Sequence, residues 1–447
     1  MDNVSVATEN EQFIGDENYY GRILNVAVEI GSAILSYGGS VSRVETAVER
    51  ICAAYGAKEV NVFAIPSMII AGVELADGTE ISQMKRVYSI SNNLAMLEKY
   101  NQLSRDICKN KYDLKTLFEQ FNKVKQSKPS NKYITLLGGA LVSGAFNVYF
   151  GGGLIDFIPA LLIGTLMTYL NGVFSAKAFN SYARTFTLSV IGGTLAIFLC
   201  WLLSLIGIQC HTDMVMIGTI MIVVPGLLIC NAVRDLFTGD LLSGTLQILN
   251  GVLVTLAIAA GYGVAMFIFK DIMVNANGPL RDLFPFNFGY YYYVIPFCMV
   301  GAFGVALWFN LSFKRMGWAM LNTLITFIVF LVMQYYTHDD PFLTNLVATI
   351  VASVISETLA RVVKSPATVF LIPAIIPFVP GASLYYTMNY LVLGDTANAV
   401  TRGTYTGLIF LGIAIGLSMV TMIFQLIMPV KIKMNLKHKL RFIHKKN

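Results

Sequence analysis

From residue 133 to residue 430 the chain is dominated by ten apolar stretches, each near the ~20 residues with which a helix crosses a bilayer. Only 13% of all residues are charged, against roughly 25% in soluble globular proteins. These features predict a polytopic α-helical membrane protein with ten transmembrane helices. The predicted spans are 133–150, 154–174, 185–208, 214–232, 241–269, 290–313, 319–336, 341–363, 367–393 and 404–430.

The tripeptide Val-Pro-Gly occurs twice in these stretches, at 224–226 and at 379–381. Gly-Asp follows each copy, and both pairs of motifs are 155 residues apart. Proline removes a backbone donor and glycine adds conformational freedom, so each copy predicts a broken helix. Paired breaks at corresponding places in two halves indicate a transporter binding site. Two ordinary proline kinks, which membrane helices tolerate, are the alternative.

The spans divide into two halves of five, residues 131–270 and 290–430, joined by a linker over 271–289. Because five is odd, the halves enter the membrane from opposite sides, as inverted repeats do in many secondary transporters. The two breaks could then meet near the midplane.

Basic residues such as Lys177, Lys314 and Lys364 gather in one set of loops. These loops lie on the same side of the membrane as the lysines before the first span and the basic tail 431–447. The positive-inside rule places this side in the cytoplasm. The sequence therefore predicts a multi-pass plasma-membrane protein with cytoplasmic termini and an extracellular linker. The same charges favour contact with anionic lipid over nucleic acid. No cleavable signal peptide is expected at the N-terminus.

Before the spans, residues 1–18 are expected to be mobile and residues 19–130 to form a cytoplasmic α+β domain. Its pattern predicts two helices, three strands and two more helices, with Ser40 as an N-cap and a hairpin turn at Asp77-Gly78. A three-stranded sheet has exposed edges, so we expect a homo-oligomer that this domain forms or steadies.

Several kinds of chemistry lack support in the sequence. No Walker loop, strand-linked GxGxxG or HExxH motif is present, so no cofactor, metal or catalytic site is predicted. The six cysteines lack CxxC spacing, and neither disulfides nor a zinc site are expected. The four histidines, His211 among them, lie outside the apolar stretches and are expected to be solvated.

Several motifs resemble the threonine/serine exporter family. They are Gly31-Ser32, Ser42-Arg43-Val44-Glu45, Val62-Phe63-Ala64-Ile65-Pro66, Gly151-Gly152 with Ile155-Asp156, Arg234-Asp235-Leu236, Ile375-Ile376-Pro377 and the two Val-Pro-Gly copies. The resemblance covers about residues 21–429 and implies a fused form of proteins that some relatives make as two chains. It implies export of threonine and serine, or of dicarboxylates such as succinate as in the split form, driven by the proton-motive force.

Polar residues within or beside the spans are the candidate site. The expected substrate pathway comprises Pro225, Gly226, Asn231, Pro380, Gly381, Ser383 and Asn389. The candidates for proton coupling or gating are Glu357, Arg361, Arg234, Asp235, Asp240 and Asp156. Charge buried in lipid is costly, so Glu357 is a candidate proton carrier; a simple i,i+4 ion pair with Arg361 is the alternative. Helix capping is the alternative for Asp156 and Asp240.

The sequence thus predicts a secondary active exporter of small amino acids or carboxylates, with the substrate and protons as its partners. A membrane-anchored hydrolase or sensor, with the soluble domain as the active part, is the alternative. Residues 20–130 contain no histidine, which argues against a nucleophile–histidine pair there.

Overall fold

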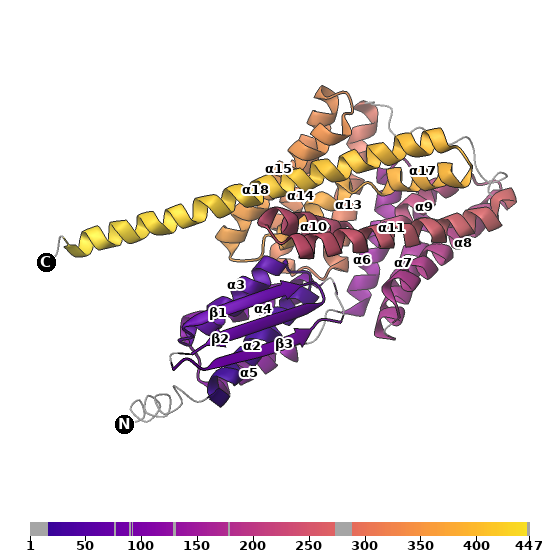
Figure 1. Ribbon diagram of the computed structural model, residues 1–447. Coiled ribbons are helices and arrows are strands. Elements are labelled where there is room, and N and C mark those ends of the chain that lie inside the picture. Colours follow the sequence, from indigo (N-terminus) through magenta and orange to yellow (C-terminus); the bar gives the residue numbers. More distant parts are fainter. Residues whose placement is uncertain are drawn as a thin grey trace.

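The computed structural model describes residues 17–75, 77–88, 91, 93–127, 131–177, 179–272 and 288–444. The predicted N-terminal segment 1–18 and linker 271–289 lie almost entirely outside these residues, as do the side chains of the basic tail 431–447. A small α/β part at the N-terminus lies against one end of a bundle of long helices (Figure 1). The last helix extends beyond the bundle on the side of this N-terminal part (Figure 1).

The N-terminal part has the predicted order of elements. They are α2 (Glu17–Ser36), α3 (Val41–Ala54), β1 (Glu59–Ile65), β2 (Met68–Glu74), β3 (Glu80–Arg86), α4 (Leu94–Asn110) and α5 (Leu114–Lys125). Ser40 occupies the N-cap position of α3, as predicted, although its side chain makes no capping hydrogen bond. In the predicted hairpin turn, the Asp77 carboxylate accepts a hydrogen bond from the Thr79 N–H, and Gly78 has a φ of 87°.

The sheet is antiparallel in the order β1-β2-β3. Phe63 lies opposite Ile70, and Ile70 lies opposite Met84, so these three side chains form a row on one face. All three are exposed, whereas Ile69 and Ala71 on the other face are buried against the helices. This alternation is the strand periodicity expected for a sheet with one covered face.

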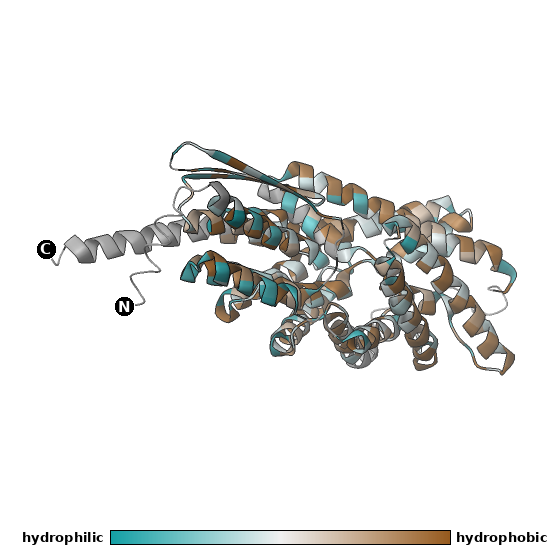
Figure 2. Ribbon diagram, turned by 90° about the horizontal axis from the view of Figure 1, so that it is seen from below, coloured by the Kyte–Doolittle hydropathy of each residue, from teal (hydrophilic) through white to brown (hydrophobic). Residues whose placement is uncertain are grey.

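The bundle contains the remaining helices. They are α6 (Lys132–Tyr149), α7 (Leu154–Ala176), α8 (Ser181–Leu205), α9 (Thr212–Ile220), α10 (Gly226–Thr238), α11 (Leu241–Ile268), α13 (Phe288–Trp308), α14 (Phe313–Tyr336), α15 (Pro341–Val363), α16 (Thr368–Ile375), the 3₁₀ helix η1 (Ile376–Phe378), α17 (Gly381–Val392) and α18 (Thr396–His444). Each predicted span coincides with one helix or with a broken pair. Hydrophobic residues predominate along these helices, and hydrophilic ones are more frequent in the N-terminal part (Figure 2).

Six helical segments in the described part are long and apolar enough to cross a membrane: α7, α8, α11, α14, α15 and residues 396–424 of α18. The bent pair of α16 with η1 and α17, with an angle of 41° at its break, would make a seventh. The chain is therefore a mostly helical multi-pass membrane protein with a small N-terminal sheet. The count of ten spans and the inverted repeat stay predictions.

The two halves pack on each other through α6 and α13. A β-carbon added at Gly138 would lie 2.4 Å from the backbone nitrogen of Trp308, and one at Gly304 would lie 2.9 Å from that of Val142. Glycine allows this close approach of two helix backbones, as it commonly does in membrane proteins. Other contacts occur in matched pairs: α8–α11 with α15–α18, α10–α11 with α17–α18, and α10–α18 with α11–α17.

Candidate functional site

Both Val-Pro-Gly copies break a helix, as predicted, and they do so with nearly the same backbone. Pro225 has φ −81° and ψ 49°, and Pro380 has φ −78° and ψ 55°. The Gly226 and Gly381 N–H groups each bond to the carbonyl oxygen two residues earlier, at 2.9 and 2.7 Å. These are inverse γ-turns centred on proline. Each turn ends one helix segment and starts the next, so both breaks expose backbone groups at the start of α10 and α17.

The two breaks lie against each other. A β-carbon added at Gly226 would be 3.1 Å from Val379 Cγ2, and one added at Gly381 would be 2.7 Å from Met221 Sδ. Each glycine therefore packs against a side chain beside the other break. Larger side chains at either glycine would push the two broken helices apart.

A first cavity of about 250 Å³ lies on one side of this contact. Five of its lining residues come from the N-terminal part: Leu35, Gly38, Gly39, Val41 and Pro66. Its polar lining from the bundle includes Asn171, Arg184, Asn231, Gln247 and Asn250. Within the described residues no acidic side chain pairs with Arg184. The first cavity thus offers one cation among amide groups.

A second cavity of about 260 Å³ lies on the other side and is lined by residues of the bundle alone. Its walls are mostly aromatic and aliphatic, and its polar lining includes Gln334, Asp339, Asn345, Ser383, Arg402 and Tyr405. Val379 lines both cavities, so its contact with Gly226 lies between them. Each cavity therefore contains one of the two breaks and one arginine.

The predicted pathway residues divide between these cavities. Pro225, Gly226 and Asn231 line the first cavity, and Pro380 and Ser383 line the second. Gly381 and the buried Asn389 line neither. The Ser383 hydroxyl accepts a hydrogen bond from the Thr406 hydroxyl at 2.9 Å. The sequence pattern missed Arg184 and Arg402, although basic residues within or next to apolar stretches are a signal for them.

Glu357 lies apart from both cavities. Its carboxylate is 3.7 Å from Arg361, which also lies 4.1 Å above the ring of Phe424. This placement matches the i,i+4 ion pair that the sequence offered as the alternative to a proton carrier.

The acidic residues near the first break have different environments. Asp235 is fully buried and accepts hydrogen bonds from Ser243 at 2.9 Å and from Gln247 at 2.6 Å. Asp240 occupies the N-cap position of α11, as the capping alternative expects, but its carboxylate makes no capping hydrogen bond there. The side chain of Arg234 lies outside the described residues.

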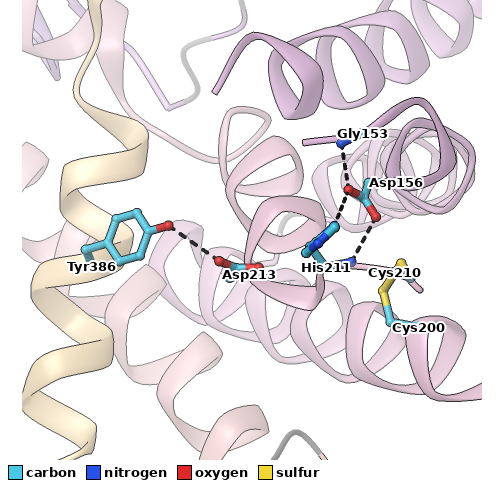
Figure 3. Close-up of polar contacts among 7 residues, drawn as sticks. All are labelled: Gly153, Asp156, Cys200, Cys210, His211, Asp213 and Tyr386. Carbon is cyan, nitrogen blue, oxygen red and sulfur yellow. Dashed lines mark hydrogen bonds and ion pairs between the residues drawn. A yellow bond between two sulfur atoms is a disulfide. The ribbon is translucent and has the colours of Figure 1, made fainter. Parts of the chain in front are cut away.

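Asp156 caps α7 and does more. Its carboxylate accepts a hydrogen bond from the Gly153 N–H at 2.7 Å, as a capping residue does, yet the residue is fully buried (Figure 3). The other partner is His211, whose backbone N–H lies 2.8 Å and whose Nδ1 lies 2.9 Å from the carboxylate oxygens. The expectation of a freely solvated His211 is therefore wrong, since this loop folds back onto the start of α7.

Cys200 and Cys210 form a disulfide next to His211 (Figure 3). Their Cα atoms are 5.1 Å apart, within the range that a disulfide allows. The expectation of no disulfides is wrong, because spacing motifs do not reveal a helix residue and a loop residue brought together by a chain reversal. Within the described residues no three His, Cys, Asp or Glu side chains form a group that could hold a metal ion.

A polar contact joins α9 of the first half to α17 of the second. The Tyr386 hydroxyl of α17 donates to the Asp213 carboxylate of α9 across 3.5 Å (Figure 3). Both residues are buried, and Asp213 lies within electrostatic range of Asp156 and His211. Neither residue was a sequence-based candidate, because only the fold brings position 213 next to position 386.

The N-terminal part contacts both halves of the bundle. The backbone N–H groups of Leu94 and Ala95 donate to the carbonyl oxygens of Phe309 and Asn310, at 2.9 and 3.2 Å. An ion pair of 2.7 Å joins Glu98 of α4 to Arg315 of α14. The Gly38 carbonyl lies 3.5 Å from the Asn231 side-chain nitrogen in α10. The N-terminal part therefore bridges the first break and the start of α14.

Glu45 lies where α3 faces the bundle. Burial raises the pKa of its carboxyl from 4.5 to about 7, and the neighbouring Asp240, Glu49 and Asp235 charges add to the rise. The hydrogen bond from the Ala64 N–H opposes it. This carboxyl thus changes charge near neutral pH at the contact between the N-terminal part and the bundle.

Comparisons with known proteins agree with these features. One family model of threonine/serine exporters matches residues 25–269, and a second, described as "Threonine/Serine exporter, ThrE", matches residues 295–423. The threonine/serine exporter of Corynebacterium glutamicum is 24% identical over 262 residues, which are 56% of this chain and 52% of that protein. The match thus spans about half the length of this curated relative. No solved structure matches. The chain belongs to the threonine/serine exporter family, a family of membrane transporters.

Proposed function

We propose that this protein is a secondary active exporter that moves threonine, serine or a similar small solute across the plasma membrane, driven by the proton gradient. Ten spans form two inverted halves, and the N- and C-termini are cytoplasmic. The first cavity receives the solute from the cytoplasm, and the second cavity releases it outside. The named relative supports the amino-acid substrate, although its match covers only about half of its length.

The observation that carries this proposal is the meeting of the two broken helices between two cavities. Val379 lines both cavities and packs against Gly226, so a small separation of the breaks would join the cavities into one route. Transporters with inverted repeats place their sites at such discontinuous helices and open to each side in turn. The matched contacts of the two halves support this symmetry.

The charges of the first cavity suit a carboxylate. Arg184 supplies a cation, and the first turn of α10 supplies backbone N–H groups with a partial positive charge. Asn171 and Asn250 can donate further hydrogen bonds from the same wall. A small solute bearing a carboxylate would therefore be held next to the first break.

Asp213 is the described acidic group best placed to carry the proton. It is buried at the contact between the halves, where its bond to Tyr386 would break if α9 and α17 separated. Proton binding would then depend on the same movement that opens the route. Glu357 pairs with Arg361 and lines neither cavity.

Counterflow in proteoliposomes tests the proposal. Vesicles containing the purified protein and loaded with unlabelled serine, threonine or succinate should accumulate the labelled amino acids, and a pH gradient should drive net flux. Absence of flux for every small solute, in vesicles where the protein remains folded, would refute the exporter.

A further inference from the structure

We infer that the second cavity is a binding site of its own, built for a zwitterionic solute with its carboxylate on Arg402 and its ammonium group on Asn345. The inference rests on the proposed export function, because it treats this cavity as the last compartment of the route. It assigns that compartment a ligand orientation and a preference for amino acids over dicarboxylates.

The first indication is a buried acceptor without a donor. Asn345 is 4% exposed, and its Nδ2 donates to the Pro341 carbonyl at 2.8 Å. Its Oδ1 accepts no hydrogen bond from the described residues and belongs to a side chain lining the second cavity. Reversing the amide would set its oxygen against the Pro341 carbonyl oxygen, so the orientation is determined by that bond. A buried carbonyl oxygen left unpaired is costly, and a ligand N–H or O–H would relieve the cost.

The second indication is an arginine that forms no ion pair with a described acidic residue. Arg402 lies in the first turns of α18 and lines the same cavity. No carboxylate within the described residues forms an ion pair with it, and Asp395 nearby uses its carboxylate to bond Asn398. A guanidinium group binds carboxylates well because it presents parallel N–H donors.

Further groups complete the polarity of the site. Asp339 lines the cavity as well, and the Tyr405 ring lies within electrostatic range of both Asp339 and Arg402. The Ser383 hydroxyl connects the cavity to the second break through its 3.3 Å bond to the Pro380 carbonyl. Aromatic walls from Tyr149, Phe150 and Phe330 enclose these few polar groups, as in small-molecule sites generally.

This arrangement selects by charge. One carboxylate and one ammonium group satisfy Arg402 and the Asn345 oxygen together, whereas the second carboxylate of succinate would face the Asn345 oxygen and Asp339. Repulsion between these oxygens would weaken binding of a dicarboxylate. A solute lacking either charged end would lose one of the two contacts.

Binding of serine, 2-aminoethanol and 3-hydroxypropanoate to the full-length protein in nanodiscs tests the assignment by calorimetry. The last two compounds lack the carboxylate and the ammonium group of serine, respectively. Wild-type protein should prefer serine over both by about tenfold or more, as expected when a charge-assisted hydrogen bond is lost. Arg402→Gln should abolish the preference over 2-aminoethanol, and Asn345→Leu should abolish the preference over 3-hydroxypropanoate.

Two further variants keep the test decisive. Asn345→Ala removes the acceptor without adding bulk, so it should lose the same preference over 3-hydroxypropanoate even if Asn345→Leu fails to fold. Arg22→Gln changes an exposed arginine of α2 and should leave all three affinities unchanged. Unchanged serine affinity in folded Arg402→Gln and Asn345→Leu proteins would overturn the assignment of this site. The Asn345 oxygen would then be paired with a water molecule and not with a ligand. Serine flux in the wild type, measured separately, shows whether the export function itself stands.

Discussion

Part of the wall of the first cavity comes from the N-terminal part, whereas the second cavity is lined only by residues of the bundle. The breaks that adjoin them have the same proline-centred turn, and each packs its glycine against a side chain beside the other break. The backbone at the centre is thus alike in both halves, and the difference lies in what surrounds it. In the proposed route, the N-terminal part therefore borders one cavity, through residues such as Gly38 and Gly39, and not the other.

The largest expected effect comes from Gly226 and Gly381, because they form the contact between the two breaks. Gly226→Leu or Gly381→Leu would overpack the contact with Val379 or Met221, which typically costs ~1–3 kcal/mol. We expect flux in proteoliposomes to fall at least tenfold, with the protein still folded by size-exclusion chromatography. Gly317→Leu is the matched control, because a β-carbon there meets nothing within 4 Å. Normal flux in both central variants would mean that the breaks are ordinary kinks.

Asp213→Asn tests the bond between the halves. Asparagine keeps a partner for Tyr386 but cannot release a proton, so net flux should lose its dependence on the pH gradient. Exchange of labelled for unlabelled serine at equal pH should persist. Gradient-driven flux at the wild-type rate would remove Asp213 from the coupling mechanism.

Disrupting the docking of the N-terminal domain should affect the first cavity only. Glu98→Arg places two cations together at the Arg315 contact and should weaken docking by about 1 kcal/mol, the upper range for a partly exposed pair. Hydrogen exchange of the Leu94 and Ala95 amides should then accelerate. The double variant Glu98→Arg, Arg315→Glu restores opposite charges and should restore protection; equal exchange in both variants would exclude this ion pair as the cause.

Glu45 should give the protein a stability that depends on pH. Its folded pKa of about 7 exceeds the ordinary value of 4.5, so the folded state binds the proton more tightly. Stability from this group is therefore complete below about pH 4.5 and is lost as the pH rises through 7. Thermal unfolding midpoints should fall between pH 5 and pH 8 in the wild type, and by less in Glu45→Gln. Identical pH profiles would contradict the assignment.

The smallest effect is expected for Glu357→Gln. Losing an i,i+4 ion pair costs only a few tenths of a kcal/mol, and Glu357 lines neither cavity. Flux should retain its dependence on the pH gradient. A loss of that dependence in this variant, with none in Asp213→Asn, would make Glu357 the proton carrier.

Local patterns in the sequence predicted the helices, the strand order of the N-terminal part and both breaks. Hydropathy marks the apolar helices, and Asp-Gly and Pro-Gly determine the backbone conformation at the residues where they occur. The candidate site was only partly accessible. Pro225 was found as part of a break, and Asn231 and Ser383 were found by their short distance along the chain from a break. The contacts of Asp156 with His211 and of Asp213 with Tyr386 were not, since they join residues 55 and 173 positions apart. Pairings of this kind depend on the packing of whole helices, which a single sequence does not display.

The crossing of α6 and α13 has a mechanical consequence. At Gly138 and Gly304 the two helix backbones touch without intervening side chains, so no rotamer change can relieve a displacement there. Closely packed interfaces tend to move as rigid units, and hinges form at a few residues elsewhere. If the halves rock against each other, this crossing is the natural pivot. The contacts that the halves make through side chains, such as Gly226 with Val379 and Asp213 with Tyr386, are then the ones that such a movement would change.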